Sequence, residues 1–222
     1  MRLNADFSER VVVRPDDYRW VDSPAPGVER MMLDRIGEEV ARATSLVRYA
    51  PLSSFPAHVH GGGEEFLVLE GEFGDEHRNY PQGTYVRNPI GTEHAPRIGA
   101  QGCTIFVKLC QFEEDDTESV VVDTRMVKPD FECAPGVEMT ILHRFGEETV
   151  YLVRWTPGTP FNARVYPGGA EMLVLEGSFS DEHGHYPAGT WVRYPDGSRH
   201  EPFTKNEGAA SYVKTGHLPP AR

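Results

Sequence analysis

The chain repeats itself at a spacing of 106 residues, and this feature restricts the possible folds more than any other. The stretch that begins at Glu65 reads "EFLVLEGEFGDEHRNYPQGTYVRNPIGTEHAP". It aligns without a gap with "EMLVLEGSFSDEHGHYPAGTWVRYPDGSRHEP", which begins at Glu171. The same spacing joins Lys108 to Lys214. A repeat of this length is one structural unit present twice, so we expect two similar units.

The repeat also extends upstream, where "PGVERMMLDRIGEE" aligns with "PGVEMTILHRFGEE" at a spacing of 109 residues. Between the copies lies "QFEEDDTESV", residues 111–120, which is polar and acidic as a surface connection should be. We therefore place the domain boundary in this stretch and predict domains at residues 1–112 and 113–222. About 100 residues is enough for a small β domain with its own core.

Short apolar clusters separated by turn residues indicate an all-β fold. The chain has 22 glycines and 18 prolines, spread along its length, and they punctuate apolar runs such as "FLVLEGEF" and "TYVRNP". No long helical period interrupts this pattern. We predict two tandem domains of short antiparallel strands.

A net charge of −12 argues against nucleic acid and anionic membranes as partners, because no basic cluster is available to neutralise phosphates. No stretch has the length of a signal peptide core or a membrane helix, so we expect a cytoplasmic protein. The three cysteines lack CxxC spacing. They therefore indicate neither a disulfide framework nor a thiolate zinc site.

Three histidines and a glutamate of the first copy form a candidate metal site. His58 and His60 are two residues apart, so in an extended segment their side chains point to the same face. "GGG" then lets the backbone turn and return Glu64 toward the same centre, and His94 arrives from another strand. Imidazole and carboxylate ligands suit zinc, iron, manganese, nickel or copper rather than calcium or magnesium.

Glu65 is the alternative carboxylate ligand, because alternation along the strand puts Glu64 and Glu65 on opposite faces. The second copy favours Glu64. There Ala170 replaces Glu64, whereas Glu171 retains the position of Glu65, as a residue needed by the scaffold would.

The second copy has lost the ligand set, since Arg164 replaces His58 and Tyr166 replaces His60, while His200 is retained at the position of His94. Arginine stays protonated and cannot bind a metal. We expect an internal ion pair between Arg164 and Glu171 in this domain; the alternative is that Arg164 and Tyr166 hold an anion.

The spacing of these residues resembles the two motifs of the cupin family. From His58 the chain reads HxHxxxExxxxxxG, and from Gly83 it reads GxxxxxPxGxxH, with Ile98 where the family has asparagine. The resemblance implies that each domain is an antiparallel jelly-roll barrel with the metal inside its mouth. It also implies His58, His60, Glu64 and His94 as ligands, and it makes a homodimer a further expectation.

More narrowly, the first copy is similar to the cupin domain of ChrR-type anti-sigma factors. That resemblance implies zinc at the four positions and a role in sensing or binding a small molecule or an oxidised product. In those proteins a helical N-terminal domain with an HxxxCxxC signature binds the sigma factor. The signature is absent from this sequence, so a sigma factor is not an expected partner.

An enzymatic function is the alternative hypothesis. Related cupins cleave diketones or hydroxyketones with oxygen, which implies a dioxygenase that uses iron, manganese or zinc. No catalytic residue can be named from the sequence, and a small molecule is the expected partner under either hypothesis.

Overall fold

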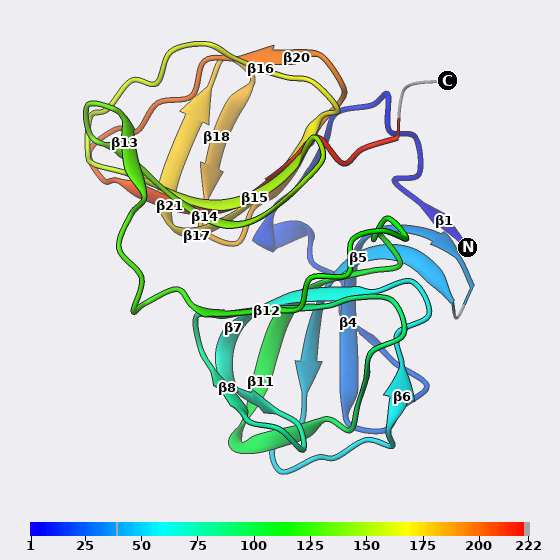
Figure 1. Ribbon diagram of the computed structural model, residues 1–222. Helices are drawn as coiled ribbons and strands as arrows, with labels where there is room; N and C mark the ends of the chain where they lie inside the picture. Colours follow the sequence, from blue (N-terminus) through cyan, green and yellow to red (C-terminus); the bar gives the residue numbers. More distant parts are fainter. Residues whose placement is uncertain (39, 220–222) are drawn as a thin grey trace. The chain divides into compact units, whose positions relative to one another are not determined.

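The computed structural model describes residues 1–38 and 40–219. Regular structure in these residues is almost entirely antiparallel β-strand, with one short 3-10 turn, η1 (Pro15–Asp17), and no α-helix. The predicted all-β class is therefore confirmed. The chain divides into two compact units, described separately below (Figure 1).

The first unit comprises residues 1–5 and 19–127. Its main sheet has the order β1-β4-β5-β11-β7-β9-β12, and β3 and β8 pair with β4 and β7. A second, two-stranded sheet is formed by β6 and β10. The strands are β1 (Arg2–Leu3), β3 (Val21–Asp22), β4 (Val28–Gly37), β5 (Ala41–Tyr49), β6 (His58–Val59), β7 (Glu64–Gly74), β8 (Asn79–Pro81), β9 (Thr84–Asn88), β10 (Glu93–His94), β11 (Arg97–Leu109) and β12 (Val120–Asp123).

The second unit comprises residues 6–18 and 128–222. Its main sheet has the order β13-β14-β15-β21-β17-β19-β2, with β18 paired to β17, and β16 pairs with β20. The strands are β2 (Val11–Val13), β13 (Phe131–Ala134), β14 (Val137–Phe145), β15 (Glu148–Trp155), β16 (Arg164–Tyr166), β17 (Ala170–Asp181), β18 (Gly184–Pro187), β19 (Trp191–Tyr194), β20 (Ser198–His200) and β21 (Ala209–Thr215).

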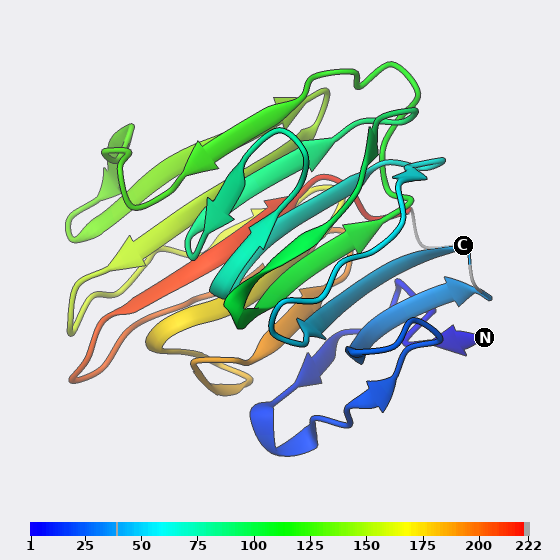
Figure 2. The same ribbon diagram turned by 90° about the horizontal axis from the view of Figure 1, so that it is seen from below.

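The two units repeat the same strand order, as the sequence repeat predicts. The order β4-β5-β11-β7-β9 in the first unit corresponds to β14-β15-β21-β17-β19 in the second. In the first unit the long strand β11 lies between β5 and β7 (Figure 2). Ile105 of β11 pairs with Val47 of β5 and with Val68 of β7. Strand β21 occupies the same central place in the second unit.

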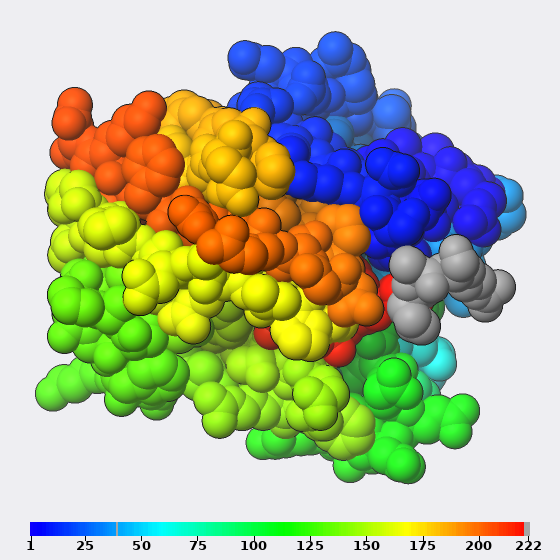
Figure 3. Space-filling model, turned by 90° about the horizontal axis from the view of Figure 1, so that it is seen from above, coloured from blue at the N-terminus to red at the C-terminus, as the bar shows by residue number. Residues whose placement is uncertain are grey.

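One strand of each unit comes from the start of the other copy. Val11–Val13 and Val120–Val122 are both "VVV" and stand 109 residues apart, so they are equivalent in the repeat. Strand β2 pairs with β19 of the second unit, whereas β12 pairs with β9 of the first. Figure 3 shows the blue N-terminal segment lying against orange residues of the second unit. The predicted domain boundary between residues 112 and 113 separates the two copies of the sequence repeat, and it stays a prediction.

Alternation along β7 fills the first unit's interior. Phe66 and Val68 belong to a buried apolar cluster, and Glu64 lies on the same face by the two-residue period. Strand β7 and β11 approach closely at Gly71, where a Cβ atom would lie 2.0 Å from the Gly102 carbonyl oxygen. This contact recurs at Gly177 and explains why both copies keep "LVLEG".

In the described part of the chain, none of the helical structure is long and apolar enough to cross a membrane. The expected cytoplasmic location and the expected absence of membrane and nucleic-acid partners stay predictions.

Candidate metal centre

Two short strands at one end of the first unit bring three histidines together. The register of β6 and β10 places His58 directly opposite His94. His60 follows β6, and its backbone N–H donates to the Thr92 carbonyl at 2.9 Å. The centroids of the three imidazole rings lie 4.6 to 5.2 Å apart.

Glu64, the first residue of β7, completes the group. Its Oε1 atom lies 3.5 Å from Nε2 of His60 and 3.7 Å from Nε2 of His94. One ligand atom from each of His58, His60, Glu64 and His94 lies within 4.8 Å of all the others. The structure therefore brings together all four residues that the sequence predicted as ligands.

The glycine run before β7 makes this return possible. Gly63 has φ of +76°, in the left-handed region that favours glycine. A Cβ atom at this position would lie 2.4 Å from the Phe112 ring. A side chain at Gly63 would therefore displace either Phe112 or the turn that delivers Glu64.

The hydrogen bonds of His58 and His60 fix which ring nitrogen faces the group. Nδ1 of His58 lies 3.2 Å from the Pro56 carbonyl, which only accepts. Nδ1 of His60 lies 3.0 Å from the Thr92 hydroxyl, whose own hydrogen is donated to the Pro89 carbonyl at 2.7 Å. Both Nδ1 atoms therefore carry the proton, and both Nε2 atoms present a lone pair to the centre.

The carboxylate of Asp75 lies near the third histidine, beyond hydrogen-bond distance. Its Oδ2 atom lies 3.9 Å from Nδ1 of His94. Burial acts to raise the pKa of Asp75, but hydrogen bonds from the Tyr80 hydroxyl and from the backbone N–H groups of Arg78 and His77 outweigh it and lower that pKa. A charged carboxylate beside Nδ1 favours the tautomer in which Nε2 of His94 is free to bind a metal.

Three of the four candidate ligands are buried, and their pKa values reflect it. Burial, together with the neighbouring imidazoles, lowers the pKa of His60 and of His94 to about 4. Burial also raises the pKa of Glu64 to about 7, although the Asn88 amide donates to its Oε1 at 3.2 Å. His58 is exposed. Near neutral pH His60 and His94 are therefore neutral, as metal ligands must be.

The Nε2 atoms of His60 and His94 are buried and have no hydrogen-bond partner among the described residues. Buried polar atoms are nearly always paired, so these two need an explanation. In a tetrahedral zinc site with metal–ligand distances of about 2.1 Å, any two ligand atoms lie about 3.4 Å apart. The measured separations of 3.5 and 3.7 Å from Glu64 are close to that value, so the residues fit a metal ion.

Glu65 points away from this group. Its Oε2 atom accepts hydrogen bonds from Arg87 at 2.7 Å and from the Tyr85 hydroxyl at 3.1 Å. Arg87 also forms an ion pair with Asp116, and all these side chains are buried. Glu65 is therefore part of a buried ion-pair network of the scaffold, and Glu64 is the carboxylate that faces the histidines.

The second unit has converted the equivalent group into an internal hydrogen-bond network. Strands β16 and β20 place Arg164 opposite His200, the register seen for His58 and His94. Nε2 of His200 lies 3.0 Å from the Tyr166 hydroxyl, and Nδ1 lies 3.3 Å from Asp181. Both ring nitrogens of His200 therefore have oxygen atoms of the protein as partners, and neither is left to bind a metal.

The expected ion pair between Arg164 and Glu171 is wrong. The guanidinium of Arg164 lies over the Phe161 ring, 4.0 Å from its centroid, whereas Glu171 lies 3.5 Å from the His217 ring nitrogen. Side chains alternate between the two faces of a strand, and Glu171 stands at the position of Glu65, whose side chain points away from the metal ligands. Glu171 therefore lies on the opposite face of β17 from the side chains that replace those ligands.

Sequence reasoning missed Asp75 and Thr92, the residues that support the histidines through Nδ1. A signal for Asp75 was present, since "DEH" recurs at Asp181 in the other copy. Asp181 also lies beside the histidine of its own unit. Thr92 corresponds to Ser198, so a hydroxyl is retained at that position as well.

Comparison with known proteins supports the fold and the repeat. The sequence model of the ChrR cupin-like domain matches residues 8–113 and again residues 117–219. No match was found among curated proteins.

Solved structures with the same fold are distant in sequence. A proposed dioxygenase from Nostoc punctiforme is 14% identical with a TM-score of 0.71, covering 100% of this chain and 82% of that chain. A proposed glyoxylate-induced protein from Pseudomonas aeruginosa is 14% identical with a TM-score of 0.77, covering 92% and 88%. A mutant of Bacillus subtilis oxalate decarboxylase is 12% identical with a TM-score of 0.64, covering 95% and 78%. At these identities the likeness establishes the fold alone.

Proposed function

The chain belongs to the ChrR cupin-like domain family and consists of two such domains in tandem, and from this premise we propose that it is a zinc-binding sensor or binding protein. Its first unit would hold one zinc ion through His58, His60, Glu64 and His94. The second unit would hold none at the equivalent position.

The observation that carries the proposal is the pair of buried, unpartnered Nε2 atoms on His60 and His94, both facing Glu64. Three imidazoles and one carboxylate are ligand types that zinc binds. Hydrogen-bond acceptors at Nδ1 orient the rings of His58 and His60 in advance, so binding needs little rearrangement of these two side chains.

A bound zinc ion supplies a Lewis-acid centre that can take an oxygen atom of a small ligand as a further ligand. The protein's part is to hold the four side chains and to keep the centre dry on the sides formed by His60, Glu64 and His94. His58 is exposed, so it lies where a small oxidised molecule would approach.

A metal-dependent dioxygenase is the second candidate function. The exposed position of His58 favours it, because a substrate can reach the centre from solvent. A proposed dioxygenase and an oxalate decarboxylase share the fold. Iron, manganese or nickel would then replace zinc, with positions left open for substrate and oxygen.

Metal analysis of the full chain, purified without nickel resin, tests the proposal. We expect about one zinc ion per chain and no oxygen uptake with diketones. His94→Ala should remove most of the metal, and His200→Ala, the same position in the second unit, should leave the content unchanged. Bound iron together with oxygen uptake on diketones would contradict the sensor function and favour the dioxygenase function. Unchanged metal in His94→Ala would refute the ligand assignment itself.

A further inference from the structure

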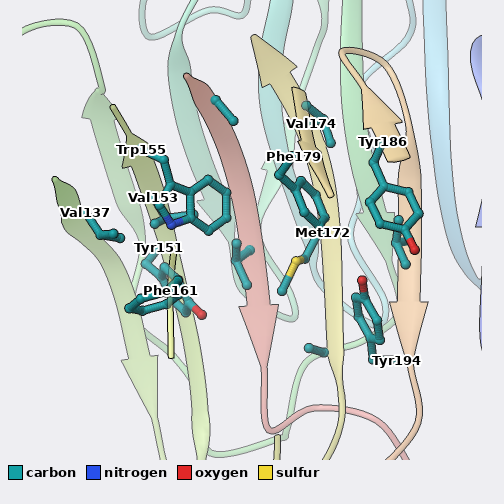
Figure 4. Packing of buried hydrophobic residues seen from close by; sticks show 14 of the residues in the cluster. Val137, Tyr151, Val153, Trp155, Phe161, Met172, Val174, Phe179, Tyr186 and Tyr194 are labelled. Carbon is teal, nitrogen blue, oxygen red and sulfur yellow. The ribbon is translucent and has the colours of Figure 1, made fainter. Parts of the chain in front are cut away.

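The second unit contains a pocket of about 400 Å³ at the end where its metal site has been lost. Arg164 and Tyr166, which replace the histidines of the first unit, both line it. Its walls are part of the unit's apolar core, and Figure 4 shows Tyr151, Trp155 and Phe161 grouped together on one side of that core. A pocket of this size is in the range that binds small organic molecules.

Arg164 brings a positive charge without a carboxylate partner into this pocket. Among the described residues its contacts are the Phe161 ring and the Cys133 thiol, and it forms no ion pair. The other charged residue on the pocket lining, Glu147, is exposed and not paired with Arg164. A guanidinium is the side chain best suited to bind a carboxylate through two parallel hydrogen bonds.

A second donor lines the same pocket. The Tyr151 hydroxyl has no hydrogen-bond partner among the described residues, and burial raises the pKa of Tyr151, so the hydroxyl keeps its proton. A guanidinium only donates. Arg164 and Tyr151 therefore offer donors to a ligand, while the Glu147 carboxylate lies at the exposed part of the lining.

Most of the remaining lining is apolar, with Met139, Met172 and Val213 beside the aromatic rings. The Thr215 hydroxyl also lies on the lining and donates to the Thr149 carbonyl. Tyr166 adds its ring, while its hydroxyl is already engaged with His200. A ligand that matches both features has an apolar body and one anionic group with several acceptor sites.

We propose that this pocket binds a small monocarboxylic acid with an aromatic or aliphatic body, the carboxylate on Arg164 with the Tyr151 hydroxyl as a further donor. The proposal goes beyond the metal centre, because none of these residues belongs to the metal ligands or to the first unit. The second unit is then a metal-free ligand-binding domain.

Isothermal titration of the full-length protein with phenylacetate tests the proposal, with phenylacetamide as the uncharged ligand of the same shape. Hydrogen bonds to charged groups imply about 10-fold to 100-fold tighter binding of the acid than of the amide. Arg164→Gln should lower the affinity for phenylacetate by the same factor. The control Arg154→Gln changes an exposed arginine paired with Glu176 in the same unit and should change nothing.

A carboxylate that binds instead to a metal in the first unit would still bind to Arg164→Gln, and that result overturns the proposal. Absence of phenylacetate binding at millimolar concentration, or equal binding of acid and amide, overturns it as well. If Arg164→Gln does not fold, Tyr151→Phe serves as the second variant, since it removes only the hydroxyl. It should weaken phenylacetate binding about 5-fold to 10-fold, the effect of one hydrogen bond, and unchanged binding would contradict the proposal.

Discussion

Glu64 and Glu65 are adjacent in the sequence but have different roles. The side-chain alternation of β7 turns Glu64 toward the three histidines and Glu65 toward Arg87. This division was predictable from the sequence, because the repeat replaces Glu64 by Ala170 and retains Glu65 as Glu171. The repeated "DEH" marked Asp75 in the sequence, but no spacing rule connects Asp75 or Thr92 to a particular histidine, so their places beside Nδ1 were not predictable.

The two glutamates should respond differently to removal of their charge. Glu64→Gln should lower the affinity for zinc strongly and leave folding intact. Glu65→Gln should leave the metal content unchanged and lower the free energy of unfolding by about 3 kcal/mol, because a buried arginine loses part of its compensation. Metal analysis and urea denaturation of both variants measure these effects. A metal-free Glu65→Gln variant that is fully stable would contradict the assignment.

The pKa values of the ligands predict how metal binding depends on pH. At pH 6 Glu64 is mostly protonated, since its pKa is about 7, while His60 and His94 are neutral, with pKa values of about 4. Zinc must displace the Glu64 proton, so its affinity should fall by up to about 10-fold per unit as the pH decreases from 7 toward 4. Titration calorimetry in buffers of different ionisation enthalpy should detect close to one released proton at pH 6 and far fewer at pH 8. Equal release at both values would contradict the burial of Glu64.

At the scale of elements, the metal centre depends on the β6–β10 pair and on the loop between β9 and β10. That loop contains Thr92, whose hydroxyl oxygen accepts a hydrogen bond from Nδ1 of His60. The sequence predicted that His94 would come from a different strand, and the structure confirms it. It did not predict the direct pairing of His58 and His94, because strands of two residues carry no periodic signal.

Thr92→Val should weaken zinc binding about 10-fold to 100-fold, because His60 loses the acceptor that orients its ring. The matched control is Ser198→Ala, which changes the equivalent position in the second unit and should leave zinc affinity unchanged. Competition with a chromophoric chelator measures both affinities. An unaffected Thr92→Val variant would show that the orientation of His60 does not depend on this hydroxyl.

At the scale of the whole molecule, the exchange of β2 and β12 means that each unit is completed by residues from the start of the other copy. The sequence repeat predicted two similar domains, and the family match confirms two copies. The partners of the "VVV" strands were not predictable. A three-residue strand pairs with whichever sheet edge its chain reaches, and that path is set by contacts far away in the sequence.

Two fragments of the chain test this exchange. Residues 19–127 keep β12 beside β9, whereas residues 1–112 lack β12 and carry β2 without β19. We therefore expect the 19–127 fragment to melt cooperatively and at a higher temperature than the 1–112 fragment, as followed by circular dichroism. Because the 19–127 fragment lacks β1, which pairs with β4, equal stability of the two fragments would mean that β12 contributes no more than β1 to the first unit.

We propose that one of the two related barrels holds a metal ion and that the other has replaced it with protein atoms. Anomalous diffraction from crystals of the zinc-loaded protein, measured at the zinc absorption edge, locates the ion. We expect one peak per chain, within bonding distance of Nε2 of His58, His60 and His94 and of a carboxylate oxygen of Glu64. A peak beside His200, a peak bound to Glu65, or no peak among the four residues would contradict it.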